Sequence, residues 1–194
     1  ALDIAEYEKD VDYDVLICAC LLHDIGRKAQ IENKKISHAK AGAEMAVSYL
    51  SGQGYDREYV SKVEHCILAH SFRKSGGILP ESIEAEILFD ADKIDVTGAL
   101  GAARTLQYGG QVSEPIYTRL PDGRIADGEE ETEDSFFHEY KQKLIKIYDM
   151  LYTKRGREIA MERKAAAVAF YESLCREVDS AFRKGTARLD VTIQ

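Results

Sequence analysis

The spacing of apolar residues along the chain predicts helices over most of its length. Asp12 can cap a helix that contains the run VLICACLLHDIG, and this run is apolar almost all round. Such a helix belongs in the middle of a core. Gly26 is expected to end it, and residues 27–36 to form a polar, basic loop. We expect the next helix to begin after the capping residue Ser37.

Later segments carry apolar residues at the same spacing of three and four positions. One of them starts at Pro80, a residue suited to the first turn of a helix, and its pattern continues as far as Tyr108. The chain then closes with two long amphipathic segments. The sequence therefore predicts further helices over residues 56–70, 80–108, 137–151 and 159–178.

Residues 109–134 break the helical pattern. The segment IYTRLPDGRIA is typical of a small β-hairpin around a Pro-Asp-Gly turn, and the acidic run DGEEETED is typical of a solvated loop. We therefore expect an all-α bundle of about seven helices with a small β-hairpin insertion, forming one domain over residues 1–194. Its expected parts are a core region (12–108), the hairpin and acidic loop (109–134) and C-terminal helices (135–183).

Composition and charge narrow the class of protein. Hydrophobic residues make up 45% of the 194 residues, which excludes a disordered chain. The 34 acidic and 26 basic side chains give a net charge of −8, which argues against binding to duplex nucleic acid. Apolar stretches fall short of the roughly 18 residues that cross a membrane. The four cysteines form no C-x-x-C pair, and we expect them to be reduced in a cytoplasmic protein.

Four of the five histidines, His23, His38, His65 and His70, lie between residues 23 and 70. The first of them forms a doublet with Asp24 at the end of an otherwise apolar helix. An adjacent imidazole and carboxylate are expensive to bury unless something binds them. A divalent metal such as Mn, Mg, Fe, Co, Ni or Zn is the usual partner. The alternative, a doublet that faces solvent at a helix end, stays open at this point.

A second acidic group follows in the segment LFDADKID. Asp92 and Asp95 are three positions apart and share a helix face, whereas Asp90 points elsewhere. The apolar stripe of this helix faces the core, so we expect Asp92 at the edge of the core. Carboxylates at this spacing repel each other unless a cation joins them, and Lys93 is the nearest candidate. A solvated acid pair is the alternative.

Together the two segments form a pattern. An HD doublet followed 68 residues later by an aspartate within ADK resembles the HD superfamily of metal-dependent phosphohydrolases. The resemblance is strongest over residues 12–108 and rests on LLHDIGRKAQ, HAKAGAEMA, HCILAH and LFDADKIDVTGALGAARTLQYGG. The segments SEPIY, SFFHEYKQKL and YTKRGREIA resemble one branch of small stand-alone bacterial enzymes. A member of that branch hydrolyses nucleoside triphosphates to the monophosphate and pyrophosphate.

The resemblance implies an HD-domain helical bundle and a set of metal ligands. The doublet places two of them on His23 and Asp24, and the distant family aspartate falls on Asp92. The first family histidine has no counterpart in residues 1–22, and we expect it upstream of Ala1 in an N-terminally incomplete sequence. A site with three ligands is the alternative. The expected catalytic carboxylates are Asp24, Asp92 and Asp95, with Asp95 or a neighbouring carboxylate as the proton acceptor.

Basic residues and histidines near the doublet are expected to bind the phosphate substrate. Arg27 can form paired hydrogen bonds with phosphate oxygens beside the metal. Three histidines resemble ligands of a second metal in some family members, and in a single-metal member they contact phosphate or donate protons. A core role for His70 and a solvated one for His65 are the alternatives. The expected substrate-binding residues are Arg27, His38, His65, His70 and Lys93, of which Lys93 either neutralises phosphate or offsets a carboxylate.

The resemblance thus implies a hydrolase that uses a divalent metal and acts on a small phosphate substrate, a nucleotide above all. Hydrolysis of a nucleoside triphosphate to monophosphate and pyrophosphate is the first expectation. A phosphomonoesterase or phosphodiesterase acting on a signalling nucleotide is the second. A non-catalytic helical module that binds metal or nucleotide for regulation is a third. The long terminal helices are compatible with a homodimer, although an internal core explains their apolar stripes equally well.

Overall fold

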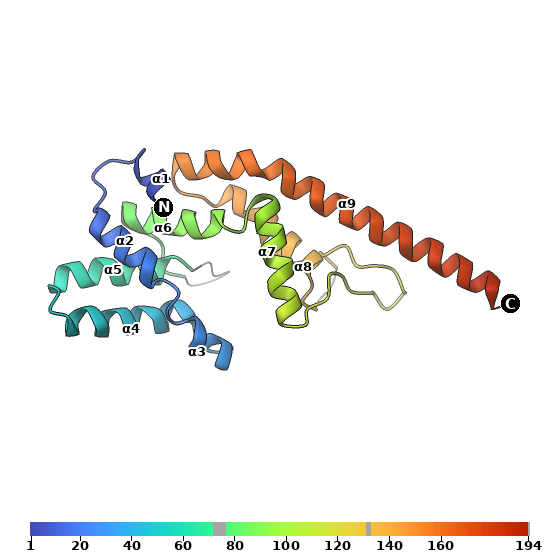
Figure 1. Ribbon diagram of the computed structural model, residues 1–194, viewed down its shortest axis with the longest axis horizontal. Coiled ribbons are helices and arrows are strands. Elements are labelled where there is room, and N and C mark those ends of the chain that lie inside the picture. The colour runs from blue at the N-terminus through green and yellow to red at the C-terminus, as the bar shows by residue number, and fades with distance from the viewer. Residues whose placement is uncertain (72–76, 131–132, 194) are drawn as a thin grey trace. The chain divides into compact units, whose positions relative to one another are not determined.

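A computed structural model describes residues 1–71, 77–130 and 133–193 (Figure 1). These residues form two compact units. The first unit comprises Ala1–Lys93 and Leu151–Arg157, and the second comprises Ile94–Met150 and the chain from Glu158 onward. Most of the described residues are helical, which confirms the all-α class. The single domain over residues 1–194 stays a prediction.

The first unit is built from short and medium helices, of which α2, α4 and α5 begin where the sequence predicts them. They are α1 (Leu2–Ala5), α2 (Tyr13–Leu22), α3 (Arg27–Glu32), α4 (His38–Gly52), α5 (Arg57–Ala69) and α6 (Ile83–Ile94), whose last residue belongs to the second unit. Side chains cap three of these helices, because Asp12, Ser37 and Asp56 each accept a hydrogen bond from the backbone N–H three residues later. The predicted caps Asp12 and Ser37 are therefore confirmed, and Asp56 caps the helix that the sequence predicts to start there.

The core of the first unit lies where α2 and α4 pack against α5 (Figure 1). Only one face of α2 is buried, since Ile17 and Leu21 are exposed. The prediction that this helix is surrounded by core is therefore wrong, because α2 packs through a single face. The core is formed by Val15, Ala19, Ala43, Ala46, Leu50, Val63, Ile67 and Leu88.

Gly26 has a different role from the predicted helix stop. The helix before it ends at Leu22, and Gly26 directly precedes α3, so the loop predicted over 27–36 is helical in its first part. Its φ of −80° needs no glycine. The backbone of α4 instead passes so close that a Cβ at Gly26 would overlap the carbonyl oxygen of His38 and the amide nitrogen of Gly42. Close packing of the backbone therefore requires this glycine.

The second unit contains α7 (Gly98–Gln111), α8 (Phe136–Gln142), a 3₁₀ helix η1 (Leu144–Asp149) and most of α9 (Lys154–Thr192). The helix predicted over 80–108 is therefore broken between α6 and α7. At the break the Thr97 hydroxyl donates to the Ile94 carbonyl, and Gly98 has a positive φ of 68°. The helix predicted over 137–151 is likewise divided, into α8 and η1.

Aromatic rings hold the second unit together. Tyr140 and Tyr171 stack with their centroids 3.8 Å apart, and Phe137 meets Tyr171 edge-on. The predicted hairpin is reduced, among the described residues, to one antiparallel bridge between Arg119 and Ile125. None of the helices in the described ranges has the length and apolar character needed to cross a membrane.

Asp90 is a fully buried carboxylate on α6 that connects two distant parts of the first unit. Its Oδ1 accepts the N–H of Tyr152 at 2.9 Å, and its Oδ2 accepts the N–H and the hydroxyl of Thr153 at 2.7 and 2.6 Å. Burial raises the pKa of Asp90, while these hydrogen bonds act in the opposite direction. The three bonds hold residues 151–157 against α6.

Replacing Asp90 with alanine is expected to lower the free energy of unfolding by about 2–5 kcal/mol, because two buried N–H groups and a hydroxyl lose their acceptor. Urea unfolding followed by circular dichroism measures the change. The exposed Glu44, changed to alanine, serves as the control and should shift stability by less than about 0.5 kcal/mol. Equal stability of the two variants would contradict the assigned role.

Candidate metal centre

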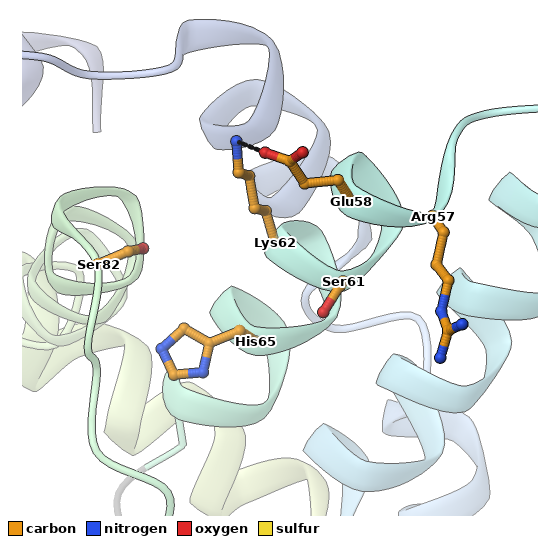
Figure 2. A pocket seen from close by; sticks show the side chains of 6 residues that line it. All are labelled: Arg57, Glu58, Ser61, Lys62, His65 and Ser82. Carbon is orange, nitrogen blue, oxygen red and sulfur yellow. Dashed lines mark ion pairs between the residues drawn. The ribbon is translucent and has the colours of Figure 1, made fainter.

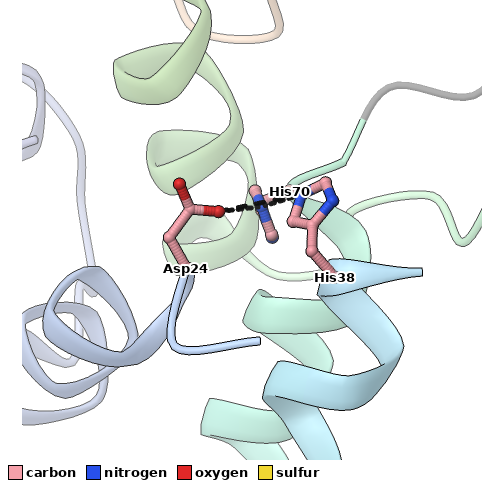
Figure 3. Close-up of side chains that lie close together, drawn as sticks. All are labelled: Asp24, His38 and His70. Atoms are coloured by element: carbon pink, nitrogen blue, oxygen red, sulfur yellow. Dashed lines mark hydrogen bonds and ion pairs between the residues drawn. The ribbon is translucent and has the colours of Figure 1, made fainter. Parts of the chain in front are cut away.

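Asp24, His38 and His70 converge in the first unit (Figure 3). One side-chain ligand atom from each lies within 4.8 Å of the other two. The Oδ1 atom of Asp24 is 3.7 Å from the Nε2 atom of His38 and 3.8 Å from that of His70. The two Nε2 atoms are 3.3 Å apart. Carboxylates and imidazoles are donor types that divalent cations take.

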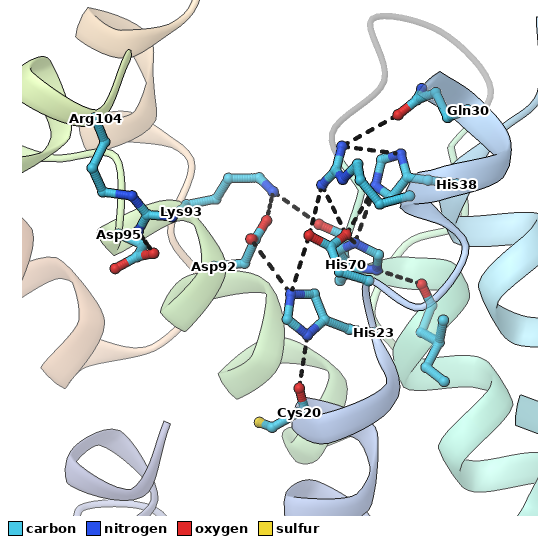
Figure 4. A network of polar contacts seen from close by, with 12 residues as sticks. Cys20, His23, Gln30, His38, His70, Asp92, Lys93, Asp95 and Arg104 are labelled. Carbon is cyan, nitrogen blue, oxygen red and sulfur yellow. Dashed lines mark hydrogen bonds and ion pairs between the residues drawn. The ribbon is translucent and has the colours of Figure 1, made fainter. Parts of the chain in front are cut away.

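His23 and Asp92 extend this group (Figure 4). The Nε2 atom of His23 lies 3.8 Å from Oδ2 of Asp24 and 3.9 Å from Oδ1 of Asp92. The rings of His23 and His70 meet edge-on with centroids 5.1 Å apart. We call these five residues, His23, Asp24, His38, His70 and Asp92, the His/Asp cluster.

Helix ends bring the His/Asp cluster together. His23 is the C-cap of α2 and His70 the C-cap of α5, while His38 is the first residue of α4. Asp24 lies in the turn between α2 and α3, and Asp92 lies near the end of α6. The capping residues before α2, α4 and α5 fix where these helices start, and the helix lengths then fix where their ends fall.

Backbone carbonyls determine which nitrogen of two histidines carries a proton. The Nδ1 atom of His23 lies 2.8 Å from the carbonyl oxygen of Cys20, and that of His70 lies 2.5 Å from the carbonyl oxygen of Ile67. A carbonyl only accepts, so each Nδ1 donates its N–H. In a neutral ring the Nε2 atom then keeps its lone pair and faces the carboxylates. This orientation is the one that metal-binding histidines usually have.

His38 takes the opposite tautomer. Its Nδ1 atom is 3.4 Å from Nη1 of Arg27, and a guanidinium only donates, so the proton of neutral His38 resides on Nε2. That N–H points to the Nε2 atom of His70. Burial, followed by the charge of Arg27, lowers the pKa of His38 to about 4. Burial also lowers the pKa of His70, so both rings are neutral at pH 7.

Each carboxylate of the cluster has its own cation. The Nη2 atom of Arg27 donates to both oxygens of Asp24, at 2.8 and 3.0 Å. The ammonium of Lys93 lies 2.6 Å from Oδ2 of Asp92. Burial alone would raise the pKa of Asp92, but Lys93 and the neighbouring histidines hold it below its usual value. Asp92 is thus available as an anionic oxygen donor at neutral pH.

The His/Asp cluster therefore fits a divalent cation. It offers the carboxylate oxygens of Asp24 and Asp92 together with the Nε2 lone pairs of His23 and His70, a set that suits Mn, Fe, Co, Ni or Zn and, through the carboxylates, Mg.

A family model for the HD domain matches residues 1–97 of the chain. The chain belongs to the HD-domain family. The YpgQ protein of Bacillus subtilis (strain 168) is 30% identical over 178 residues, which cover 90% of this chain and 77% of YpgQ.

Solved structures share the fold. The crystal structure of a predicted HD superfamily hydrolase from an uncultured Thermotogales bacterium matches with a TM-score of 0.56 and 27% identity, covering 90% of this chain and 73% of that one. Bacillus subtilis YpgQ in complex with ADP matches with a TM-score of 0.54 and 21% identity, covering 86% and 89%. The family match and the hydrolase neighbour support an HD-type, metal-dependent hydrolase.

The structure brings the three predicted HD ligands together, since His23 lies between Asp24 and Asp92. It also places His38 and His70 beside them, although the sequence predicts substrate binding for these two residues. Arg27 contacts Asp24 and His38, and Gln30 accepts a hydrogen bond from Arg27 at 3.3 Å. Gln30 was not predicted from the sequence, and its signal is the spacing of three positions from Arg27 on one helix.

Two predicted residues lie outside the His/Asp cluster. His65 lines a shallow pocket on α5 (Figure 2), and its Nε2 atom accepts the N–H of Glu81 at 2.9 Å. Asp95 belongs to the second unit and pairs with Arg104. Substrate binding by His65 and proton transfer by Asp95 stay predictions. The pocket is lined by Arg57, Glu58, Ser61, Lys62, His65 and Ser82.

The lowered pKa values of His38 and His70 make the fold of this HD protein sensitive to acid. The unfolded chain binds protons at these histidines near pH 6.5, whereas the folded chain does so only at lower pH, near 4 for His38. The free energy of unfolding should therefore fall as pH drops below about 6.5, by up to about 1.4 kcal/mol per pH unit and histidine.

Urea unfolding at several pH values, with a chelator present, measures this dependence. The variant His38→Gln should flatten the slope between pH 6.5 and 4, because it removes one titrating ring. A slope identical to that of the parent chain would contradict the assignment.

Proposed function

We propose that this HD-domain protein hydrolyses nucleoside triphosphates to the monophosphate and pyrophosphate with the help of a divalent metal. The observation that carries the proposal is the convergence of His23, Asp24 and Asp92, with inward lone pairs, beside the guanidinium of Arg27. Carboxylates and imidazoles alone would suit a structural metal. The adjacent cation favours a phosphate substrate, because a guanidinium binds phosphate oxygens through paired hydrogen bonds.

His23, Asp24 and Asp92 are the proposed metal ligands. When bound, a divalent metal lowers the pKa of a coordinated water and polarises a phosphoryl oxygen. The Nε2 atom of His70 lies 3.8 Å from Oδ1 of Asp24. This neutral nitrogen therefore either binds the same metal as Asp24 or accepts a hydrogen bond at the site. The N–H that His38 carries on Nε2 is a donor for a substrate oxygen or for His70.

Arg27 is the proposed phosphate-binding residue. Its side chain is 44% exposed, so the guanidinium can meet an incoming phosphate while it stays near Asp24. Gln30 and His38 contact the Nη1 atom of Arg27, and these contacts orient the plane of the guanidinium. The positive charge of Arg27 would stabilise negative charge that develops on the phosphate chain.

A nucleotide is the proposed substrate class. The solved YpgQ complex contains ADP, and YpgQ is 30% identical to this chain over 178 residues. The overall charge of −8 does not oppose a polyphosphate substrate, because Arg27 supplies a local positive charge and the substrate brings its own metal ion.

The products test the proposal. Purified protein with Mn²⁺ and each of the common nucleoside triphosphates should release pyrophosphate and the monophosphate, both separable by anion-exchange chromatography. Release of orthophosphate and a nucleoside diphosphate would overturn the proposed bond, and orthophosphate with free nucleoside would identify a monoesterase. Metal binding without turnover of any phosphate ester would favour a regulatory module.

A further inference from the structure

Lys93 lies beside the His/Asp cluster but is itself enclosed. Its side chain is 7% exposed, compared with 44% for Arg27, the other cation at the site. Lys93 follows Asp92 on α6, and its side chain points toward Asp92 and His70 instead of into solvent (Figure 4). A buried lysine needs partners for its charge, so its contacts reveal its role.

The Lys93 ammonium contacts two oxygens and an aromatic ring. The Nζ atom donates to Oδ2 of Asp92 at 2.6 Å and to the backbone carbonyl of His70 at 2.9 Å. It also lies 4.9 Å from the ring centroid of Phe89, one helical turn earlier on α6. An ammonium has three N–H donors, and two are taken by oxygens while an aromatic ring covers another side. A phosphate would have to displace these buried contacts.

The same contacts fix the geometry of two cluster residues. Because Lys93 holds Oδ2 of Asp92, the other oxygen, Oδ1, is the one that faces Nε2 of His23. Because Lys93 also holds the His70 carbonyl at the end of α5, it connects α5 to α6 at the point where the His70 ring enters the cluster. One side chain thus sets the orientation of a carboxylate and the position of an imidazole.

We propose that Lys93 is a positioning residue for the metal site, which orients Asp92 and fixes His70, and that it does not bind the phosphate of the substrate. This proposal rests on the proposed metal site and deepens it. It divides the two cations by role, since the partly exposed Arg27 can be reached by substrate while the buried Lys93 acts through the carboxylate that it holds. Loss of such an outer partner of a metal ligand typically weakens metal affinity by about 10–100-fold.

The test measures metal binding and catalysis separately on the whole chain. In Lys93→Met, the affinity for Mn²⁺, measured by isothermal titration calorimetry without nucleotide, should fall by about 10-fold or more. At saturating Mn²⁺, kcat should fall while KM for the nucleotide stays within about twofold. Arg27→Met should raise the KM for the nucleotide, because Arg27 is the proposed phosphate-binding residue. Lys40→Met, an exposed lysine on α4, is the matched control and should change neither quantity.

A KM raised at least about tenfold in Lys93→Met, with Mn²⁺ affinity unchanged, would overturn the proposal and identify Lys93 as a phosphate ligand. If Lys93→Met does not fold, Lys93→Arg keeps the charge but alters the buried geometry. That variant should weaken Mn²⁺ binding and leave KM unchanged, and unaltered Mn²⁺ affinity in it would overturn the proposal. Because calorimetry needs no turnover, weakened Mn²⁺ binding supports the role of Lys93 even where the nucleotide reaction fails its own test.

Discussion

Replacing Asp24 with asparagine is expected to reduce metal-dependent phosphate hydrolysis by about 10³-fold or more. Asp24 lies close to all three histidines of the His/Asp cluster, since its oxygens face His23, His38 and His70. An amide loses the negative charge and one of the two acceptor oxygens. The several kcal/mol that a metal contributes to a phosphoryl transition state correspond to about three orders of magnitude in rate.

The measurement is product release under saturating Mn²⁺, together with calorimetric Mn²⁺ binding. Asp24 is 39% exposed on its side chain, so the variant should fold, and its unfolding transition checks this. Glu44→Gln, an exposed acid on α4, is the matched control and should keep full activity. Asp24→Asn that retains more than about a tenth of the activity would exclude this residue as a metal ligand.

Replacing Gly26 with alanine is expected to destabilise the first unit by about 2–5 kcal/mol and to disturb the metal site with it. The added Cβ would overlap backbone atoms of His38 and Gly42, which cannot rotate away as a flexible side chain could. The α4 helix would have to shift, and His38 is its first residue. Both stability and Mn²⁺ affinity should therefore fall.

Gly52→Ala provides the control, because Gly52 also lies on α4 and a Cβ there meets nothing within 4 Å. Alanine has the higher helix propensity, so this variant should be as stable as the parent or slightly more stable. Urea unfolding of the two variants gives the comparison. A Gly26→Ala protein as stable as Gly52→Ala would show that the two backbones can separate at no cost.

The starts of α2, α4 and α5 were predictable because their signals are local. The side chains of Asp12, Ser37 and Asp56 each accept a hydrogen bond from a backbone N–H three residues later. Because both partners are close in the sequence, such a cap can be predicted from the sequence. The helix ends and breaks were less predictable. In the sequence, Gly26 is typical of a helix end. In the structure a glycine is required there because the backbone of residues 12 to 16 positions later passes close to it. Spacing within one helix carries no information about that neighbour.

The candidate site was likewise predictable from local signals but not from tertiary contacts. The HD doublet and its distant aspartate are recognisable in the sequence, and they lie together in the structure. His70 was harder to assign, because its position on the apolar stripe of α5 suits a core histidine equally well. Its role depends on the neighbours that α2 and α6 supply, which periodicity does not reveal. The burial of Lys93 likewise depends on tertiary packing, which periodicity does not reveal.

The donors of the His/Asp cluster come from the ends of α2, α5 and α6, the start of α4 and one intervening turn. A cation bound by several of them would therefore act as a non-covalent cross-link between segments far apart in sequence. By mass action, a ligand at 100 times its dissociation constant stabilises the folded state by about 2.7 kcal/mol. The metal concentration would then determine the thermal stability of the folded chain as well as the rate of hydrolysis. Heat resistance and catalysis would therefore vary together with cellular metal content.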